Sequence, residues 1–492
     1  SVSVLKDASA TAVYGVKGAN GVILITTKRG QEGRAEIGVS VNAAVKVVSK
    51  LPGVEGSPEA LYMRNRIIER ELGLQPDSWV DMTPMDIIEK YRNPANIEEW
   101  DRYPNVDWQK ELFKDHAMAY NPNINVRGGT KFVKYYAALD YLHEGDLYRE
   151  YNVGRGYKGG FGYNRINFRS NLDFTITPTT TLKVNLSGSH GEKKAPWGLG
   201  GNDWHTTQLW SAAYSSPPDA FRPIYSDGTW GYYSPNQQAA QNSMQGVATG
   251  GIGYTTTTRI NTDFTLEQDL KFITPGLRAS AMISWDNNMQ EVNRGIWENW
   301  YKPQRKWIDP VTGEVTWEQT KEPNGLEFSE DLKWSTQSGE INQYATNRYL
   351  FYQAQLFYGR QFGKHDVTAM GVFNRAENTF GTDFTSFRED WAFRATYNFD
   401  DRYFAEFNGA YNGSEKFGRG YRFDFFPSGA IGWRISEEKF MNWSRGWLDN
   451  LKVRYSIGEV GDDNISGVRF LYLTQWAAGG NANFFPNGAS PY

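Results

Sequence analysis

The residue types that most often carry catalysis or bind metals are scattered along this sequence of 492 residues. It has no cysteine, which excludes disulfides, thiolate metal sites and cysteine catalysis. No Gly-x-Ser-x-Gly motif marks a serine nucleophile. Carboxylates are plentiful, which leaves a glycosidase pair open, but nothing singles one pair out. The histidines show no HExxH motif or paired spacing; they are His116, His143, His190, His205 and His365. We therefore predict that the protein is not an enzyme and has no cofactor and no metal site.

Two short motifs imitate ligand-binding loops. Residues Gly154–Gly159 spell GxGxxG, but a dinucleotide site needs a hydrophobic strand before the motif and a helix after it. The flanks here are REYNV and GFGYNRINF, so a plain loop is the favoured interpretation. Residues Asp462–Gly467 carry the oxygen ligands and glycine of half a calcium loop. Position 12 of that loop is Leu473 rather than an acid, which favours a structural turn.

Aromatic residues are the stronger candidates, because two long segments, 197–233 and 291–342, are rich in tryptophan and tyrosine. Such residues could pack the loops together or form an interfacial girdle. They could equally present flat faces on which sugar rings stack. We name as candidate ligand-binding residues Trp197, Trp204, Trp210, Tyr214, Trp230, Tyr232, Trp297, Trp300 and Tyr301.

Composition narrows the class of protein. The net charge of −4 gives no basic footprint for nucleic acid. The mean hydropathy is −0.62, and no run of about 18 apolar residues occurs, which excludes transmembrane helices. A large soluble β-rich protein and an outer-membrane barrel both remain, because alternating strands hide their apolar face from an averaged scale.

Strict alternation of apolar and polar residues dominates the chain after residue 33. In Arg165–Ile176, the apolar residues fall on one face of the expected strand, and arginine, asparagine, aspartate and threonine fall on the other. After the turn Thr177–Thr180 the same pattern resumes. A strand with one apolar and one charged face suits a wall between lipid and a wet lumen. We count about thirteen such strands, each close to the nine to eleven residues that cross a bilayer.

The connections between these strands alternate between short and long, which a soluble sandwich has no reason to do. Membrane barrels have short periplasmic turns and long external loops, so we predict an antiparallel outer-membrane β-barrel. Thirteen strands would leave an open edge, so we expect further strands after Tyr492. Helices are expected at 59–72, with Ser57 as the cap and Pro58 in the first turn, and at 436–450, with Ser436 as the cap. The short links lie near 130–133, 177–180, 273–276, 362–365 and 400–401, and the long ones near 51–120, 146–160, 190–255, 291–342, 378–388 and 412–421.

The first thirty residues have a different pattern, which predicts a strand, a short helix, a glycine-rich turn and a second strand. Gly15, Gly18 and Gly21 are spaced by three. Where the chain reverses tightly, it needs a residue that accepts positive φ or has no side chain, and glycine meets that need. The run from Gly21 to Lys28 is expected to be a strand buried on both faces. Because the sequence opens inside a folded element and carries no signal peptide, we expect it to be part of a longer protein.

This opening segment resembles a known family. The phrase VLKDASATAVYGVKGANGVILITTK, residues 4–28, is similar to the end of the plug domain of TonB-dependent outer-membrane transporters of the SusC/RagA type. The motif residues are Asp7, Gly15, Gly18, Asn20 and Gly21. Segments 121–148, 165–189, 396–441 and 451–465 resemble barrel hairpins of the same family. The resemblance implies that residues 1–33 end an α/β plug domain and that residues 34–492 form the N-terminal and middle part of a barrel.

The resemblance also implies a function. The family has barrels of 22 strands in the outer membrane of Bacteroidota-type bacteria, lidded by a SusD-like lipoprotein. Oligosaccharides, or sometimes peptides, are imported, and TonB drives the import by pulling on a Ton box, which would lie before Ser1. The polar wall residues Arg165, Asn167, Arg169 and Asp173 are expected to hold the plug. Two alternatives remain, namely a secreted or surface β-rich glycan-binding protein and a passive porin, which the plug segment disfavours.

Overall fold

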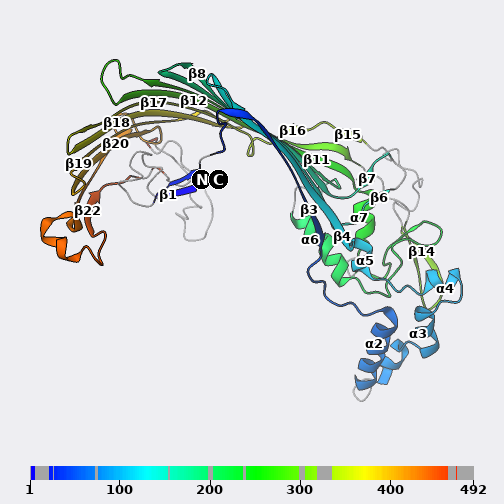
Figure 1. Ribbon diagram of the computed structural model, residues 1–492. Helices are drawn as coiled ribbons and strands as arrows, with labels where there is room; N and C mark the ends of the chain where they lie inside the picture. The colour runs from blue at the N-terminus through cyan, green and yellow to red at the C-terminus, as the bar shows by residue number, and fades with distance from the viewer. Residues whose placement is uncertain are drawn as a thin grey trace, which may run out of the picture.

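The dominant feature of the computed structural model is one large antiparallel sheet, curved into an arch (Figure 1). The structure describes residues 2–5, 22–25, 27–71, 76–152, 156–197, 203–236, 240–297, 305–318, 335–461, 463 and 472–473. Within them the main path of the sheet has thirteen strands, as the alternation predicts, and each pairs with its neighbour along the chain. They are β3 (Gly33–Val47), β4 (His116–Gly129), β5 (Val133–Gly145), β8 (Gly162–Thr177), β9 (Thr180–Ala195), β11 (Gly251–Asp269), β12 (Leu277–Trp297), β17 (Asn347–Phe362), β18 (His365–Phe380), β19 (Ser386–Phe399), β20 (Tyr403–Ser414), β21 (Phe423–Arg434) and β22 (Lys452–Gly458).

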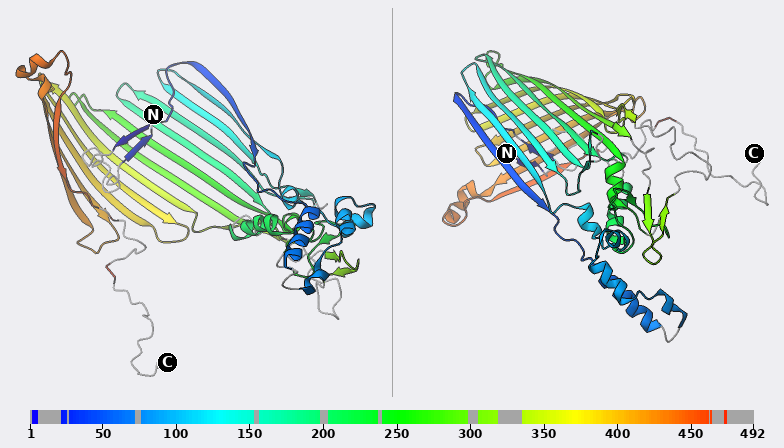
Figure 2. Two further views of the ribbon diagram at one scale, coloured as in Figure 1. Left: turned by 90° about the horizontal axis from the view of Figure 1, so that it is seen from below. Right: turned by 90° about the vertical axis from the view of Figure 1, so that its right-hand side faces the viewer.

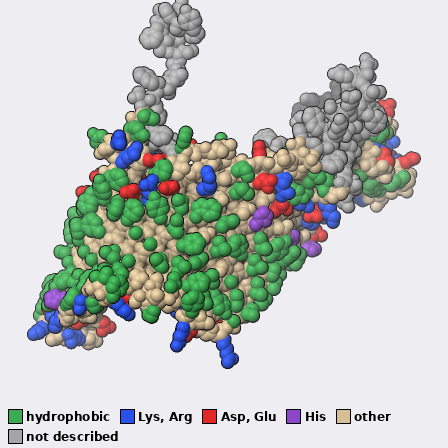
Figure 3. Space-filling model, turned by 90° about the horizontal axis from the view of Figure 1, so that it is seen from above, with side chains coloured by type: hydrophobic (Ala, Val, Ile, Leu, Met, Phe, Trp, Pro, Cys, Tyr) green, Lys and Arg blue, Asp and Glu red, His purple; other side chains and the backbone are tan. Residues whose placement is uncertain are grey.

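The two faces of the sheet differ in chemistry. Large apolar side chains such as Leu356, Trp391 and Phe407 are exposed on the convex face. They spread over the middle of that face, and charged side chains gather toward its two edges (Figure 3). The concave face carries the alternate residues, among them Asn408 and Asp390, which are buried. Because side chains alternate along a strand, the two-faced sequence pattern becomes a two-faced wall.

Short turns and long connections lie at opposite ends of the strands (Figure 2). In the turn between β19 and β20, Asp400 and Asp401 have φ of 52° and 55°. Two successive positive φ angles match the twist of the flanking strands, and aspartate tolerates that conformation better than most residues. At the other end, β15 (Ser335–Gln337) and β16 (Glu340–Ile341) extend the pairing of β12 into its long connection.

The long connections contain small helices and short strands. No helix among the described residues is long and apolar enough to cross a membrane. Asn96 caps α4 and Asp107 caps α5 by accepting a hydrogen bond from a backbone amide in the first turn. The elements are α2 (Ser57–Glu71), η2 (Pro76–Asp81), α3 (Met85–Arg92), α4 (Ile97–Arg102), α5 (Trp108–Leu112), β6 (Tyr151–Asn152), β7 (Lys158–Gly159), α6 (Asp203–Ser215), β10 (Trp230–Gly231), α7 (Ser243–Thr249), β13 (Arg305–Ile308) and β14 (Val315–Trp317).

The structure corrects two helix predictions, one in its cap and the other in the helix itself. Helix α2 forms where expected, but Ser57 lies inside it, and its hydroxyl donates to the Pro104 carbonyl at 2.7 Å. The carbonyl of Gly56 accepts the first helical bond, from Ala60 N at 2.9 Å. The helix expected at 436–450 is instead two 3-10 turns, η3 (Ile435–Glu437) and η4 (Lys439–Ser444). The extended backbone of Glu438, with ψ of 146°, separates them.

The N-terminal segment forms a two-stranded antiparallel ribbon, β1 (Val2–Leu5) with β2 (Val22–Ile25), on the concave side of the arch (Figure 1). The prediction that the second strand is buried on both faces is wrong, because Ile23, Leu24 and Ile25 are exposed. A two-stranded ribbon has no second layer to cover it. The predicted helix and glycine turn, with Asp7, Gly15, Gly18, Asn20 and Gly21, lie outside the described residues.

Candidate functional site

The polar wall contacts the segment that leads from β2 into β3. The Arg29 guanidinium donates to Asp173 Oδ1 at 2.9 Å and to Asn185 Oδ1 at 2.7 Å. The Asn171 side-chain amide, which is buried, donates to the Lys28 carbonyl at 2.8 Å. A Cβ at Gly30 would lie 2.3 Å from the backbone nitrogen of Tyr135, so only glycine fits there. Strands β5, β8 and β9 therefore form a fitted seat for this connecting segment.

Sequence reasoning identified part of this seat. Asp173 is one of the four wall residues expected to hold the plug, and it contacts Arg29. Asn167 instead donates to Asp140 Oδ2 at 2.6 Å, within the wall. Asn171 and Asn185 were missed, although they lie directly opposite each other on β8 and β9. Cross-strand pairs of asparagine on a polar face are the signal that could have found them.

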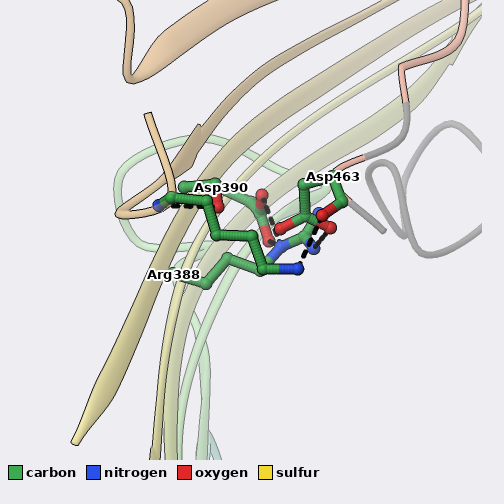
Figure 4. A network of polar contacts seen from close by, with 5 residues as sticks. Arg388, Asp390 and Asp463 are labelled. Carbon is green, nitrogen blue, oxygen red and sulfur yellow. Dashed lines mark hydrogen bonds and ion pairs between the residues drawn. The ribbon is translucent and has the colours of Figure 1, made fainter. Parts of the chain in front are cut away.

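A second polar site lies near the long-connection end of β19 (Figure 4). Arg388 Nε lies 3.1 Å from Asp390 Oδ2, and Arg388 Nη1 donates to Asp463 Oδ1 at 3.1 Å. The side chains of Arg388 and Asp390 are only 11% and 8% exposed. Lys416 Nζ donates to the Asp463 carbonyl at 2.6 Å. The network fastens a residue beyond β22 to the inner wall.

Asp463 also bears on the calcium-like motif at 462–467. It is the only described residue of that motif, and its carboxylate is engaged by Arg388. Across the described part of the chain, no group of three or more histidine, aspartate or glutamate side chains is placed to hold a metal ion.

The long connections pack into a loop assembly with aromatic cores. Trp108 and Phe221 are almost fully buried with ring centroids 4.9 Å apart, and the Trp108 indole donates to the Pro217 carbonyl at 3.0 Å. The Arg222 guanidinium lies 3.8 Å from the centre of the Trp100 ring. Burial lowers the pKa of Arg222 to about 10, and its Nε donates to the Trp100 carbonyl at 2.9 Å.

The predicted aromatic ligand-binding residues occupy different environments. Trp210 and Tyr214 stack on helix α6 with ring centroids 5.8 Å apart, and they are 37% and 43% exposed. The ring centroid of Trp210 also lies 4.7 Å from that of Phe113, and this contact anchors the stacked pair on the loop assembly. Tyr232 is only 5% exposed and lies beneath Arg305. The structure thus brings two candidates together on the surface.

The other candidates are described less completely. Trp197 and Trp230 are half-buried. The side chains of Trp204 in α6 and Trp297 in β12, and the whole of Trp300 and Tyr301, lie outside the described residues.

One ion pair links two of the long connections. Lys306 on β13 has a nearly buried side chain, and its Nζ lies 2.5 Å from Asp227 Oδ2. Burial alone would raise the pKa of Asp227, but hydrogen bonds from Lys306 and from Thr229 lower it to about 2. The pair therefore stabilises the folded loops fully above the ordinary carboxyl pKa of 3.8, and this contribution is lost as the pH falls through about 2.

Replacing Asp227 by asparagine is expected to destabilise the loop assembly by about 1 kcal/mol at pH 7, because Lys306 stays buried without its carboxylate. The difference from the unmodified protein should shrink as the pH falls from 4 to 2. The rate of limited proteolysis within residues 217–318 measures this difference in stability. Pepsin is the protease at low pH. Asp86→Asn, at an exposed carboxylate of α3, is the control. Equal cleavage of both variants at pH 7 would contradict the expectation.

The amino-acid sequence of this chain is similar to those of known outer-membrane receptors. No protein-family model matches the chain. TonB-dependent receptor P3 of Formosa agariphila is 25% identical over 482 residues, which are 95% of this chain and 42% of that protein. TonB-dependent receptor SusC of Bacteroides thetaiotaomicron is 24% identical over 519 residues, covering 100% of this chain and 46% of that protein. The chain thus spans less than half the length of these relatives.

Solved structures agree in fold. The RagAB peptide importer in its closed-closed state superposes with a TM-score of 0.62 at 18% identity, over 95% of this chain and 52% of that one. A second structure, of the RagAB peptide transporter, gives a TM-score of 0.61 at 19% identity, with the same shares covered. At this identity the likeness concerns the architecture of the sheet.

Proposed function

Because this chain is SusC-like over nearly its whole length and belongs in the outer membrane of a Bacteroidota-type bacterium, we propose that it forms part of the wall of a TonB-dependent transporter. Residues 1–33 would end the plug and residues 34–492 would form barrel strands and external loops. The observation that carries the proposal is the sheet itself, apolar on its convex face and polar on its concave face, with residues 28–30 seated on the polar side.

The seat around Arg29 suits a plug that must move in steps. Its contacts are a partly exposed ion pair and single hydrogen bonds rather than a buried apolar interface. Such contacts are individually worth about 1 kcal/mol, so a pulling force can break them one at a time. In this proposal TonB supplies that force, and the connecting segment leaves the wall one contact at a time.

The ligand and the partner belong to the same proposal. In this proposal a SusD-like surface lipoprotein covers the loop end of the barrel, as the resemblance of residues 4–28 to the SusC/RagA family implies. The imported ligand would be an oligosaccharide or, as the name of the RagAB importer suggests, a peptide. Of the candidate aromatic residues, Trp210 and Tyr214 have the best geometry for contact, because they are stacked, exposed and anchored on a packed loop assembly.

Replacing both Trp210 and Tyr214 by alanine is expected to weaken ligand binding by about tenfold, since each aromatic face contributes about 0.5–1.5 kcal/mol. The measurement is calorimetric titration of the full-length receptor with the ligand that co-purifies with it. Trp79→Ala removes a more exposed indole from η2 and serves as the control. If both variants bind as tightly as the unmodified receptor, this pair is not part of the ligand surface.

Transport itself is tested in cells. Full-length tagged protein is recovered from outer membranes, and the co-purifying lipoprotein and ligand are identified by mass spectrometry. Uptake of that ligand should stop when TonB is deleted or the proton gradient is collapsed. Uptake that survives both treatments indicates a passive porin. A protein that stays in solution without detergent indicates the surface glycan-binding alternative.

A further inference from the structure

One connection at the short-turn end of the sheet is much longer than its neighbours. Residues 435–451, which we call the turn segment, join β21 to β22 and contain the 3-10 turns η3 and η4. The neighbouring link at this end, between β19 and β20, is only 400–402. Figure 2 shows the turn segment, in orange, beyond the ends of its strands and at the opposite end of the sheet from helices α2 and α3. The wall therefore carries a projection at the end where its other described links are short.

Hydrogen bonds within the turn segment keep its backbone ordered. Met441 N donates to the Glu438 carbonyl at 2.9 Å, and Leu448 N donates to the Ser444 carbonyl at 2.9 Å. Ser444 is only 1% exposed, and its hydroxyl donates to the Met441 carbonyl at 2.8 Å. These bonds satisfy backbone groups inside the segment, which lowers the cost of moving it out of water.

Three aromatic side chains of the turn segment are exposed. Trp443 and Trp447 are 70% and 69% exposed, and Phe440 is 59% exposed. The centroids of the two tryptophan rings lie 5.9 Å apart. By comparison, Trp391 on the convex wall, which the proposed function places in lipid, is 50% exposed. Neighbouring apolar rings left open in this way mark a surface that contacts another protein or a membrane.

The turn segment joins the convex face of the sheet rather than the concave one. The ring of Phe440 packs on that of Trp433, with centroids 6.3 Å apart. Trp433 projects from β21 on the convex face, where it pairs with Tyr403 of β20 in the register. Glu438 accepts from the Tyr403 hydroxyl at 2.6 Å and from the Trp433 indole at 3.1 Å. The exposed rings therefore continue the apolar surface of the wall past the ends of its strands.

The charges of the turn segment nearly cancel. Its cations are Lys439 and Arg445, which are exposed, and its carboxylates are Glu437, Glu438 and Asp449. This balance gives little attraction to a strongly charged partner, whether a protein or an anionic lipid. Tryptophan, in contrast, is enriched at the boundary between acyl chains and headgroups, where its ring is buried and its N–H stays wet. Together with the continuity of the apolar surface, this favours phospholipid as the occupant.

We propose that the turn segment is an interfacial anchor, which inserts Phe440, Trp443 and Trp447 between the acyl chains and headgroups of the leaflet at the short-turn end. The proposal rests on the proposed function, because it takes the convex face as the lipid-facing one. The anchor fixes the depth of β21 and β22 in the bilayer, since moving these strands along the membrane normal would return the rings to water.

The experiment uses the purified full-length receptor in phospholipid vesicles that contain no other protein. Phospholipids brominated on their acyl chains quench the fluorescence of indoles that touch them. Subtracting the emission of a variant from that of the unmodified receptor isolates the indoles that the variant lacks. Trp443→Phe/Trp447→Phe reports on the anchor, and Trp391→Phe reports on the convex wall. Trp79→Phe, in η2 at the opposite end of the sheet, is the control away from lipid. All four positions are exposed, so phenylalanine is accommodated at each of them.

The proposal predicts that brominated phospholipid quenches the emission of the two turn-segment indoles about as efficiently as that of Trp391. The emission of Trp79 should be unchanged. Quenching at Trp391 without quenching of the turn-segment indoles would overturn the anchor, leave the lipid-facing wall in place and point to a protein as the occupant. Absence of quenching at Trp391 and at the turn segment would overturn the proposed function and the anchor together.

Discussion

Replacing Leu356 by arginine is expected to destabilise the sheet by about 2–4 kcal/mol, which is the cost of a charge on the lipid face near the middle of a membrane barrel. Leu356 lies midway along β17 on the convex face, where it is 51% exposed. Its partners in the register, Ala279 and Gly371, are small, so a longer side chain meets no steric obstacle. The loss therefore reports on the surrounding solvent rather than on packing.

The matched control lies three residues away on the same strand. Gln353 faces the concave side, opposite Met282 and Asn374. Arginine at this position should cost less than about 1 kcal/mol, because lumen positions tolerate charge. Both variants are compared by urea unfolding of the full-length protein in lipid vesicles, followed by tryptophan fluorescence. Equal losses would show that the convex face does not lie in lipid.

Replacing Arg388 by methionine should cost about 3 kcal/mol, the lower end of the range for breaking a buried ion pair from one side. The change leaves Asp390 buried beside the wall and removes one of the two contacts that fasten Asp463, since Lys416 still donates to its carbonyl. Adding Asp390→Asn to this variant should restore part of the loss, because the buried charge is then removed as well. The measurement is the same unfolding assay.

Arg375 provides the control for Arg388. It lies on β18, its side chain is 36% exposed, and its distances to Glu377 and Glu389 are 3.6 and 3.9 Å. Arg375→Met should therefore change stability by less than about 1 kcal/mol. If the two methionine variants prove equally stable, the network in Figure 4 contributes nothing to the fastening of Asp463.

Local patterns were enough to predict most of the fold. The period of two in Arg165–Ile176 defined both the strand and its two faces, because burial in a wall follows directly from alternation. Asp400 and Asp401 marked a two-residue turn, since few residues accept positive φ. In both cases the cause of the structure lies within a few residues of its effect.

The candidate site depended on contacts that are remote in sequence. Arg29 meets Asp173 across 144 residues, and no local pattern encodes that meeting. Ser57 was predicted to cap a helix, but its hydroxyl instead donates a hydrogen bond to the Pro104 carbonyl, which is remote in sequence. Among the aromatic candidates, Tyr232 is buried while Trp210 is exposed. Composition alone could not separate them, because both lie in the same aromatic-rich segment.

If the sheet is a barrel wall, lipid covers its convex face and water reaches its concave face. Because the chain has no cysteine, single cysteines at positions 350–360 of β17 can each carry one spin label. Accessibility to oxygen, which dissolves in lipid, and to a water-soluble nickel complex is measured in vesicles for the full-length receptor. We expect the two accessibilities to alternate along the strand with a period of two and opposite phase, with oxygen accessibility highest at Ala354 and Leu356. Low access to both reagents at these positions would contradict it, because the face would then be packed against protein.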